Sequence, residues 1–533
     1  MPLHVRVPGA RRAALAGCVV ALLAPAFAAA QQRGRTPELT VIQLNDIYRI
    51  DGVQQGRAGG PGRVATLISR AEAETGRPVV VLHAGDFIAP SLESRYFRGR
   101  QMIDAMNLLD ARAPLLAVPG NHEFDEKRPD MLAGAIAPSR FTWLGSNLAL
   151  HTGDAAADAR LRRDTILTAG RLRVGVFALT FLDAPRPYAQ ADSDVVAAAE
   201  RQIRALEAAG ANVIVGLTHL DFRTDQRVAR LRARHPRFLW IAGGHEHQLI
   251  HQPLTKRTAL ITKGDSNARR VWRVALGLDG KRPWVREDSV PLDATTPVDE
   301  AYGREVAAAY RDSMLAKVPF YQAVIGRSAV PLDGTEETVR GAESNWADWL
   351  TDLMRTAFPD DTADIAVLNG GAIRVDDVFR DTIRWEQLAR TFGFPTRVGL
   401  VRVTGADVRE MLEHSVSGNA GEGRFLQVSG LAFTFDRRRA EGQRVLAVRT
   451  GKPGAWTDLV ADSTYLVAVP DYIYAGGDGY TFASRASRRV PPGPDLKLMA
   501  FDALAGAFAR GEAIAPKVEG RIVEVGVAAK ASP

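Results

Sequence analysis

The stretch LLAVPGNHEFD, residues 115–125, decides the fold class of this 533-residue chain. It opens with an apolar run at 115–118, which has the length of a buried strand. A Pro-Gly pair then leads into three polar residues, Asn121, His122 and Glu123. A strand that ends in a glycine turn and then in side chains able to bind metal is typical of α/β proteins, which place ligand sites at the carboxyl ends of their strands.

Four further apolar runs end in the same way. They are 39–44 followed by Asn45 and Asp46, 79–82 followed by His83 and Asp86, 213–217 followed by Thr218 and His219, and 238–242 followed by Gly243, Gly244, His245, Glu246 and His247. Helical patterns at 64–74, 101–109 and 195–208 separate several of these runs. Apolar runs that alternate with helices predict a sheet covered on both faces, with the polar residues gathered at its carboxyl edge.

These polar residues predict a metal site. Each one alone has an ordinary explanation as a turn, a helix cap or a hydrogen-bonded histidine, but five strands ending in such donors indicate a shared ligand. Carboxylate, imidazole and amide donors suit Zn²⁺, Mn²⁺ or Fe, and the one cysteine, Cys18, lies outside the runs. Two such ions about 3.5–4 Å apart can clamp a phosphate and acidify a bridging water. We therefore expect two divalent metal ions, Mn, Zn or Fe.

The first thirty residues differ from the rest of the chain. Arg6, Arg11 and Arg12 precede an apolar run, 13–30, that ends in small residues. This order predicts a secretory signal peptide at 1–30, cleaved near residues 28–30, and hence a periplasmic or secreted protein. The Arg11-Arg12 pair is also compatible with a twin-arginine signal, and the segment ending at Cys18 with a lipoprotein signal, so the export route stays open.

Composition excludes several functional classes. Hydrophobic residues make up 46% and charged residues 24% of the chain, with a formal net charge of +7. Basic and acidic residues are interspersed, and no basic block carries the aromatic residues that indicate nucleic-acid binding. No run after residue 30 reaches the roughly 18 apolar residues of a membrane-spanning helix. We expect no nucleic-acid partner and no stable membrane insertion, while the oligomeric state stays open.

The strand-end motifs resemble the metallophosphoesterase signature, and Phe124-Asp125 after GNHE resembles its 5'-nucleotidase branch. The resemblance implies a set of metal ligands in which Asp86 bridges two ions. The first ion would be held by Asp46, Asp86 and His247, and the second by Asp86, Asn121, His219 and His245. It also implies that His122 is the catalytic histidine and that Asp125 orients it.

Residue 48 departs from this family pattern, which usually has a further histidine ligand there. Tyr48 has two interpretations. It either packs beside a first metal ion that keeps three protein ligands and water, or its phenolate binds a metal such as trivalent iron, whose charge favours deprotonation. The other four histidines between 83 and 251, namely His83, His151, His235 and His251, match no functional position.

The second half of the chain supplies candidate substrate contacts. Residues 367–374 indicate a strand entering a glycine turn, and 472–480 place tyrosines before a glycine loop; both are also compatible with ordinary turns and core aromatics. In family order, 340–344, 369–374, 385–394 and 476–479 resemble a 5'-nucleotidase C-terminal domain. The implied contacts are Arg340 and Arg374 to phosphate, Asn369 to the base, Phe394 and Tyr472 stacked on the base, and Asp478 to the ribose. Departures at 347–349 and 393–396 affect the expected base preference.

We therefore expect two α/β domains after the signal peptide. They are an N-terminal calcineurin-like metallophosphoesterase β-sandwich flanked by helices at 36–285, a helical linker at 286–320, and a C-terminal 5'-nucleotidase substrate domain at 321–525. The expected function is hydrolysis of nucleoside 5'-monophosphates to nucleoside and phosphate by a dimetal-activated water. Two alternatives stay open: another phosphoester, such as a 2',3'-cyclic nucleotide, a UDP-sugar or a sugar phosphate, and a nucleotide-binding protein with a decayed metal site.

Overall fold

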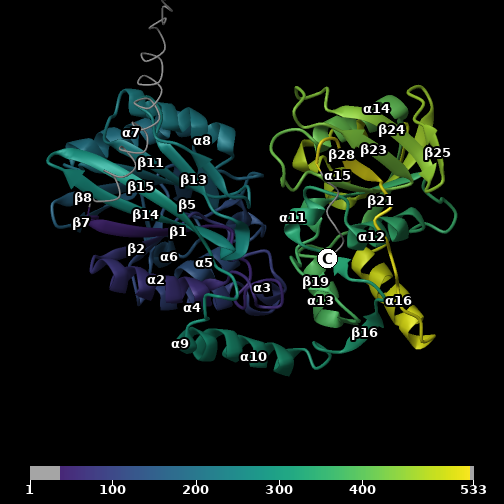
Figure 1. The fold of residues 1–533 in the computed structure, drawn as a ribbon, viewed down its shortest axis with the longest axis horizontal. Coiled ribbons are helices and arrows are strands. Elements are labelled where there is room, and N and C mark those ends of the chain that lie inside the picture. Colours follow the sequence, from purple (N-terminus) through teal and green to yellow (C-terminus); the bar gives the residue numbers. More distant parts are fainter. Residues whose placement is uncertain (1–35, 528–533) are drawn as a thin grey trace, which may run out of the picture.

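The computed structural model describes residues 36–527 and shows two lobes joined by a helical linker (Figure 1). The predicted signal peptide lies outside the described residues. Within 36–527, every helix is too short or too polar to cross a lipid bilayer.

The N-terminal lobe is built on two sheets. In hydrogen-bonded order, the first contains β15 (Arg282–Pro291), β14 (Arg270–Asp279), β1 (Leu39–Leu44), β2 (Val79–His83), β3 (Leu115–Ala117), β4 (Thr142–Leu144) and β6 (Leu161–Arg162). The second contains β12 (Ile250–Gln252), β13 (Leu260–Lys263), β11 (Phe238–Gly243), β10 (Val213–His219), β8 (Leu172–Thr180) and β7 (Asp164–Ala169). A small ribbon pairs β5 (Leu148–Leu150) with β9 (Ala189–Ala191).

The two sheets pack face to face, because their strands carry apolar side chains on both faces. Inward-facing residues such as Val41 of β1, Val215 of β10 and Trp240 of β11 share one buried cluster. The outer face of the first sheet is covered by α2 (Pro61–Thr75), α4 (Arg100–Asp110) and α5 (Asp130–Ile136), and that of the second by α7 (Val195–Ala208) and α8 (Phe222–Ala229). Short helices α3 (Leu92–Phe97) and α6 (Ala155–Asp158) complete the lobe.

The five strands of the sequence prediction are present but belong to different sheets. β1, β2 and β3 run parallel in the first sheet, and β10 and β11 run parallel in the second. An apolar run looks the same whether helices or another sheet cover the strand. The sequence therefore indicated that these strands are buried, but not which elements pack against them. The carboxyl ends still meet: the side chain of Gln43 on β1 donates a hydrogen bond to the carbonyl of Gly243 on β11, 3.0 Å away.

A helix at 300–317 joins the lobes, whereas residues 286–291 of the expected linker belong to β15 of the N-terminal sheet. It consists of α9 (Glu300–Tyr302), a π turn (Gly303–Ala308) and α10 (Ala309–Lys317). Asp299 begins it by accepting a hydrogen bond from the Tyr302 backbone amide, 2.9 Å away, as helix caps do. The Tyr302 hydroxyl in turn donates to the carbonyl of Ile50, 2.9 Å away, which holds the linker against the N-terminal lobe.

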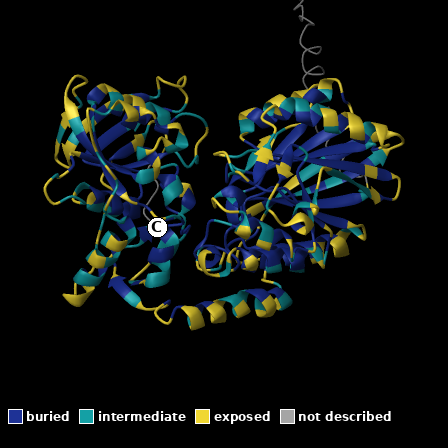
Figure 2. Cartoon of the chain, turned by 180° about the vertical axis from the view of Figure 1, so that it is seen from behind, coloured by how far each residue is buried: buried dark blue, intermediate teal, exposed yellow. Residues whose placement is uncertain are grey.

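The C-terminal lobe contains two larger sheets. One has the order β22 (Leu426–Ser429), β18 (Ile365–Asn369), β26 (Thr464–Pro470), β21 (Val398–Thr404) and β27 (Arg488–Val490), and the other β25 (Ala455–Asp458), β24 (Val445–Lys452), β23 (Leu431–Phe435) and β28 (Ile522–Glu524). Two ribbons pair β16 (Val324–Arg327) with β20 (Thr382–Arg384) and β17 (Leu332–Asp333) with β19 (Val378–Phe379). The helices are α11 (Glu336–Val339), α12 (Asn345–Arg355), α13 (Trp385–Thr391), α14 (Gly405–Ser415), α15 (Asp471–Tyr474) and α16 (Leu496–Ala509). Buried strands form the interior of both lobes (Figure 2).

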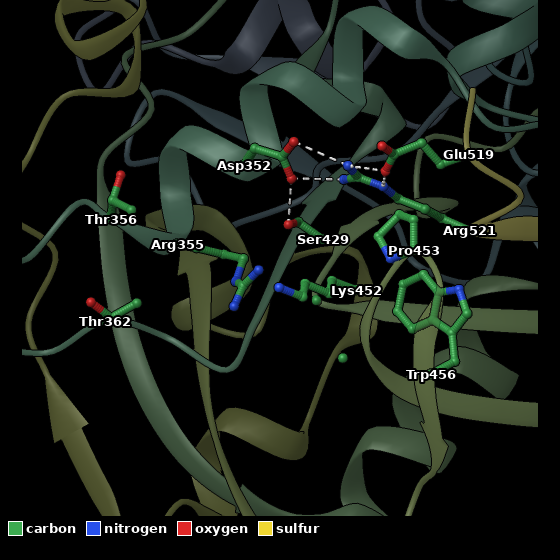
Figure 3. Close-up of a pocket in the computed structure, with 12 residues that line it drawn as sticks. Asp352, Arg355, Thr356, Thr362, Ser429, Lys452, Pro453, Trp456, Glu519 and Arg521 are labelled. Atoms are coloured by element: carbon green, nitrogen blue, oxygen red, sulfur yellow. Dashed lines mark hydrogen bonds and ion pairs between the residues drawn. The ribbon is translucent and has the colours of Figure 1, made fainter. Parts of the chain in front are cut away.

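A surface cavity of about 360 Å³ lies in the C-terminal lobe near the amino end of β18. Arg355 and Lys452 point toward one another across it, beside Trp456 (Figure 3). None of the residues predicted to bind metal or substrate lines it. The predicted site therefore lies elsewhere, at the carboxyl end of β18.

Candidate active site

Backbone contacts bring the strand ends of the two N-terminal sheets together. The amide of Asp46, after β1, donates to the carbonyl of Gly85, after β2, at 2.9 Å. Nδ1 of His219, at the end of β10, lies 2.7 Å from the carbonyl oxygen of Ala84. The amide of Gly244, after β11, donates to the carbonyl of Thr218 at 3.0 Å. The predicted ligands thus share one edge of the sandwich.

Four of the six predicted metal ligands have a left-handed backbone. The φ angles are 52° at Asp46, 59° at Asp86, 89° at His245 and 62° at His247. This region costs energy for residues with a Cβ, and such residues gather at functional sites where the surroundings enforce them. The backbone geometry itself therefore points to this edge as a site.

Two glycines allow the ligands to approach one another. A Cβ at Gly85 would lie 2.6 Å from Nδ1 of His219, and a Cβ at Gly120 would lie 2.1 Å from Oδ1 of Asp86. Both distances are shorter than a non-bonded contact permits. These turns thus require glycine, which is why the sequence shows it beside the donors.

Ligand atoms of Asp46, Asp86 and His219 lie within 4.8 Å of one another and are buried. The other predicted ligands surround this cluster. Nε2 of His247 lies 3.3 Å from Oδ1 of Asp46, Oδ1 of Asn121 lies 2.9 Å from Nε2 of His219, and the rings of His219 and His245 are 5.3 Å apart. The structure therefore brings all six predicted metal ligands to one place.

The hydrogen bonding of His219 leaves a place for a cation. Its Nδ1 must carry the proton that is donated to the Ala84 carbonyl, so Nε2 presents a lone pair whenever the ring is neutral. That lone pair faces Oδ2 of Asp86 at 3.3 Å and Oδ1 of Asn121 at 2.9 Å, which are acceptors as well. Three converging acceptors repel one another unless a proton or a metal ion lies among them. The donor set fits a divalent ion of the kind the sequence indicated.

Burial and the neighbouring charges shift the pKa values of the cluster in opposite directions. Burial lowers the pKa of His219, but Asp86 outweighs it and raises the value to about 10. Burial raises the pKa of Asp46, but His247 outweighs it and lowers the value to about 2. Burial and the neighbouring His219 lower the pKa of His245 to about 3, which keeps its ring nitrogens free of a second proton.

Tyr48 points its hydroxyl into this cluster. The oxygen lies 3.0 Å from Nε2 of His247, 3.2 Å from Oδ2 of Asp86 and 3.4 Å from Oδ1 of Asp46. Burial, with help from both carboxylates, raises the pKa of Tyr48 well above its ordinary value. The phenol is thus within reach of the first predicted metal position, and both interpretations of Tyr48 stay open.

His122 and Asp125 form a pair next to the cluster. Nδ1 of His122 lies 3.0 Å from Oδ2 of Asp125, and its Nε2 lies 4.0 Å from Oδ2 of Asp86. Burial lowers the pKa of His122, but Asp125 and Asp86 outweigh it and raise the value to about 9. The imidazole can therefore carry a positive charge at neutral pH and donate from Nε2 toward a ligand at the cluster.

Two carboxylates that received no role from the sequence hold the ligand loops. Glu123 accepts backbone hydrogen bonds from Asp86 at 3.0 Å, Phe87 at 2.8 Å and Gly120 at 2.5 Å, which ties two strand ends together. Asp183 accepts from the side-chain amide of Asn121 at 2.7 Å and so turns its Oδ1 toward His219. Position within the GNHE motif was the only sequence signal for Glu123, and Asp183 had none.

A buried lysine supports the loop that carries His245 and His247. The ammonium of Lys263 is fully buried and lies 2.8 Å from Asp225 and 2.6 Å from Glu246. It also donates to the carbonyl of Gly244 at 2.9 Å. The sequence signal was weak, a lone lysine two positions after the short apolar run 259–261.

The C-terminal lobe reaches the cluster through Glu336 and two arginines. Oε1 of Glu336 lies 2.5 Å from Nδ1 of His247 and 2.7 Å from Nη2 of Arg340. The guanidinium of Arg374 lies over the ring of Tyr48, 4.5 Å from its centre. The two predicted phosphate contacts therefore lie beside the predicted metal ligands, although they come from the other domain.

The predicted substrate residues hold buried polar atoms that lack a protein partner. Among the described residues, Nε of Arg340, Nη2 of Arg374 and Oδ1 of Asn369 have no hydrogen bond. Buried groups of this kind are rare in folded proteins and point to a missing ligand. Three of them belong to the predicted substrate set, where a polar ligand would supply the absent partners.

The remaining predicted residues frame this space. Asp478 accepts hydrogen bonds from the Asn369 amide at 2.9 Å and from the Tyr472 hydroxyl at 3.1 Å. Phe394 lies on the ring of His122, with 5.7 Å between ring centres. The Tyr472 side chain is 52% exposed, which leaves its ring available to a planar ligand. His414, whose segment 413–416 resembles the same domain but received no role from the sequence, lies with Nε2 2.7 Å from the carbonyl oxygen of Asp478.

Comparison with known proteins matches both domains of the chain to known families. Residues 39–249 match the calcineurin-like phosphoesterase family, and residues 324–485 match the 5'-nucleotidase C-terminal domain. The chain is 26% identical to the snake venom 5'-nucleotidase of Crotalus adamanteus, over 91% of this chain and 88% of that protein. It is 26% identical to the 5'-nucleotidase of Bos taurus, over 98% and 95%.

A solved structure agrees with these matches. The 5'-nucleotidase precursor from Thermus thermophilus superposes with a TM-score of 0.75 at 26% identity, over 92% of this chain and 100% of that one. These findings confirm the resemblance, the two-domain α/β fold and the class of enzyme that the sequence predicted.

Proposed function

The chain belongs to the 5'-nucleotidase family of metal-dependent phosphoester hydrolases, and from this premise we propose that it is an exported, two-metal 5'-nucleotidase. Its substrates would be nucleoside 5'-monophosphates, which it converts to nucleoside and phosphate. The observation that carries the proposal is the set of unpartnered buried polar atoms on Arg340, Arg374 and Asn369, which lies beside the cluster of metal-binding side chains.

The proposed metal ligands follow from the cluster. Asp46, Asp86 and His247 would hold one ion, and Asp86, Asn121, His219 and His245 the other. When bound, such ions withdraw charge from a phosphoryl group and supply an acidified water as the nucleophile. The converging acceptors around Nε2 of His219 support this assignment, because a divalent ion relieves their repulsion. Mn, Zn and Fe all suit this set of nitrogen and oxygen donors.

His122 would stabilise the charge that develops on the phosphoryl oxygens. With Nδ1 held by Asp125, its Nε2 proton points toward the cluster. A charged donor held in place before the reaction contributes through electrostatic stabilisation of the transition state. Asp125 would act as a positioning residue, since it contacts the imidazole and not the reacting atoms.

The C-terminal lobe would bind the nucleotide. Arg340 and Arg374 would pair with the phosphate through their unpartnered guanidinium nitrogens. Asp478 would accept from a ribose hydroxyl, and Asn369 would use Oδ1 to contact the base. Phe394 and Tyr472 would lie on either face of the base, a mode of binding that tolerates different bases.

Export is the remaining part of the proposal. The basic, apolar and small-residue order of residues 1–30 supports a periplasmic or secreted location after cleavage near residues 28–30. The relatives include a protein described as a 5'-nucleotidase precursor. An N-terminal sequence of the protein secreted by an expressing cell would locate the cleavage site directly.

The alternatives differ in substrate. A 2',3'-cyclic nucleotide, a UDP-sugar or a sugar phosphate would use the same metal cluster but different contacts in the C-terminal lobe. A sugar phosphate offers no base to Phe394 and Tyr472, so the exposed ring of Tyr472 favours a nucleotide. A decayed site would have lost donors, whereas the six predicted ligands are all present in the sequence.

The test is hydrolysis of a matched panel: AMP, UMP, 2',3'-cyclic AMP, UDP-glucose and glucose 6-phosphate, each with added Mn²⁺. The products are separated by chromatography, because the first hydrolytic step on 2',3'-cyclic AMP or UDP-glucose releases no inorganic phosphate. We expect a nucleoside 5'-monophosphate to have the highest kcat/KM and chelation to abolish activity. His122→Ala should slow turnover by about a hundredfold or more while metal content stays near that of the wild type. Loss of metal in that variant would show that His122 is a ligand. Preference for another ester would overturn the substrate assignment.

A further inference from the structure

Glu336 is the only described carboxylate of the C-terminal domain within hydrogen-bond distance of a proposed metal ligand. It opens α11, is 8% exposed, and presents Oε1 at 2.5 Å from Nδ1 of His247. Its other oxygen accepts from the hydroxyl of Ser266 in the N-terminal domain. One buried carboxylate thus contacts both domains at the edge of the cluster.

We propose that Glu336 is a positioning residue for the first metal ion, contributed across the domain boundary. It holds the His247 imidazole so that Nε2 faces Asp46 and the Tyr48 hydroxyl. The inference rests on the proposed function in one respect, namely that His247 binds a metal ion.

The hydrogen bond determines which nitrogen of His247 is available. A carboxylate accepts hydrogen bonds and donates none, so the proton of the neutral imidazole lies on Nδ1. Nε2 then presents its lone pair toward Oδ1 of Asp46, 3.3 Å away. Carboxylate partners of this kind orient metal-binding histidines and strengthen their binding, and their loss typically costs about 10–100-fold in metal affinity.

Glu336 is itself held in place from both domains. Nη2 of Arg269, in the N-terminal domain, lies 3.5 Å from Oε2. The Glu336 amide donates to Oδ1 of Asp376 at 3.0 Å, and the Arg340 guanidinium lies 2.7 Å from Oε1. These contacts hold the carboxylate against His247 while the domains stay in contact. The imidazole is therefore already oriented before a metal ion binds.

The arrangement links the metal to the substrate arginine. His247 and Arg340 share the same oxygen of Glu336, so the proposed metal ligand and the proposed phosphate contact depend on one carboxylate. The ligands of the first metal ion all come from the N-terminal domain, but His247 is oriented only when Glu336 of the C-terminal domain is in place. By linkage, metal at that site must stabilise the contact between the domains by the same free energy.

The experiment is calorimetric titration of metal-free, full-length protein with Mn²⁺, with no nucleotide present. Glu336→Gln keeps the shape of the side chain and removes its charge, and Glu300→Gln on the exposed start of α9 is the matched control. We expect Glu336→Gln to weaken one of two sites by about 10–100-fold and to leave the other within about twofold. Ser266→Ala, which removes the hydroxyl on Oε2, should weaken the same site by a smaller factor, and it provides a second test if Glu336→Gln does not fold.

Unchanged affinity at both sites, or an equal loss at both, would overturn the inference, since the first shows no role and the second only general damage. Wild-type protein that binds fewer than two ions would overturn the two-metal function and this inference together. A preferred substrate other than a nucleotide would overturn the proposed function alone, because the titration contains no substrate.

Discussion

Replacement of Lys263 by Met should destabilise the N-terminal domain strongly. The ammonium is fully buried between Asp225 at 2.8 Å and Glu246 at 2.6 Å, and it donates to the carbonyls of Leu220 at 2.6 Å and Gly244 at 2.9 Å. Burial lowers the pKa of Lys263, but the two carboxylates outweigh it and raise the value, so the side chain is charged. Methionine fills the volume but leaves two buried carboxylates without their cation.

Breaking a buried ion pair in this way costs about 3–5 kcal/mol, because the remaining charge stays desolvated. In a domain of about 250 residues, each kcal/mol lowers the melting temperature by about 2–4 °C, which gives a drop of about 6–20 °C. The loop from Gly243 to His247 should loosen as well, since Lys263 holds Gly244 and Glu246 within it. We therefore expect a lower metal content after dialysis.

The assay is thermal unfolding of the full chain by circular dichroism at pH 7.5, with metal content measured on the same samples. Lys256→Met, an exposed lysine seven positions away in the sequence, is the matched control and should melt within about 1 °C of the wild type. A drop below about 2 °C for Lys263→Met would refute the reasoning, because it would show that the two carboxylates are neutral or hydrated without the lysine.

Substitutions at three further positions test separate parts of the site and the fold. Tyr472→Ala should raise KM for a nucleotide by about 5–100-fold, the value of one base–aromatic stack, and leave an aryl phosphate nearly unchanged; equal losses on both would exclude stacking. Tyr48→His should tighten binding of a divalent ion measured by chelator competition, whereas a visible absorption band that disappears in Tyr48→Phe would show phenolate coordination instead. Burial raises the pKa of Asp348 well above its ordinary value, so folding takes up a proton there. The stabilising contribution of the protonated Asp348 side chain is complete below the unfolded-state pKa of about 3.9, and it is lost as the pH rises through the raised folded-state pKa. The melting temperature of Asp348→Asn should therefore increase relative to that of the wild type between about pH 5 and pH 8. A pH-independent difference would contradict that sign.

The local elements of the N-terminal domain could be predicted from the sequence because their signals are local. The run at 39–44 is β1 and the pattern at 195–208 is α7, each with the expected bounds. The division of the strands between two sheets could not be predicted from the apolar runs themselves, because an apolar run records burial and not the surface that covers it. The expectation of a β-sandwich came from the family resemblance of the strand-end motifs. The donors at the strand ends were still placed together, since parallel strands share a carboxyl edge in either arrangement.

The residues that support the metal ligands could not be predicted from the sequence, for a different reason. Glu336 and His247 are 89 positions apart and belong to different domains, so no local pattern joins them. Lys263 meets Asp225 and Glu246 only in the folded sheet, so its supporting role cannot be recognised from the residues next to it in the sequence. Metal ligands can be recognised by their residue type after a strand, whereas the residues that hold them are ordinary glutamates and lysines whose role depends on tertiary contacts.

The central claim is that two metal ions in the N-terminal domain hydrolyse a nucleotide bound by the C-terminal domain. The most direct measurement is the rate of phosphate release from AMP as metal-free protein receives Mn²⁺ in known steps, with bound metal counted at each step. The account predicts almost no activity without metal and a rate that levels off at two ions per chain. Full activity in the metal-free protein, or a plateau at one ion, would contradict it.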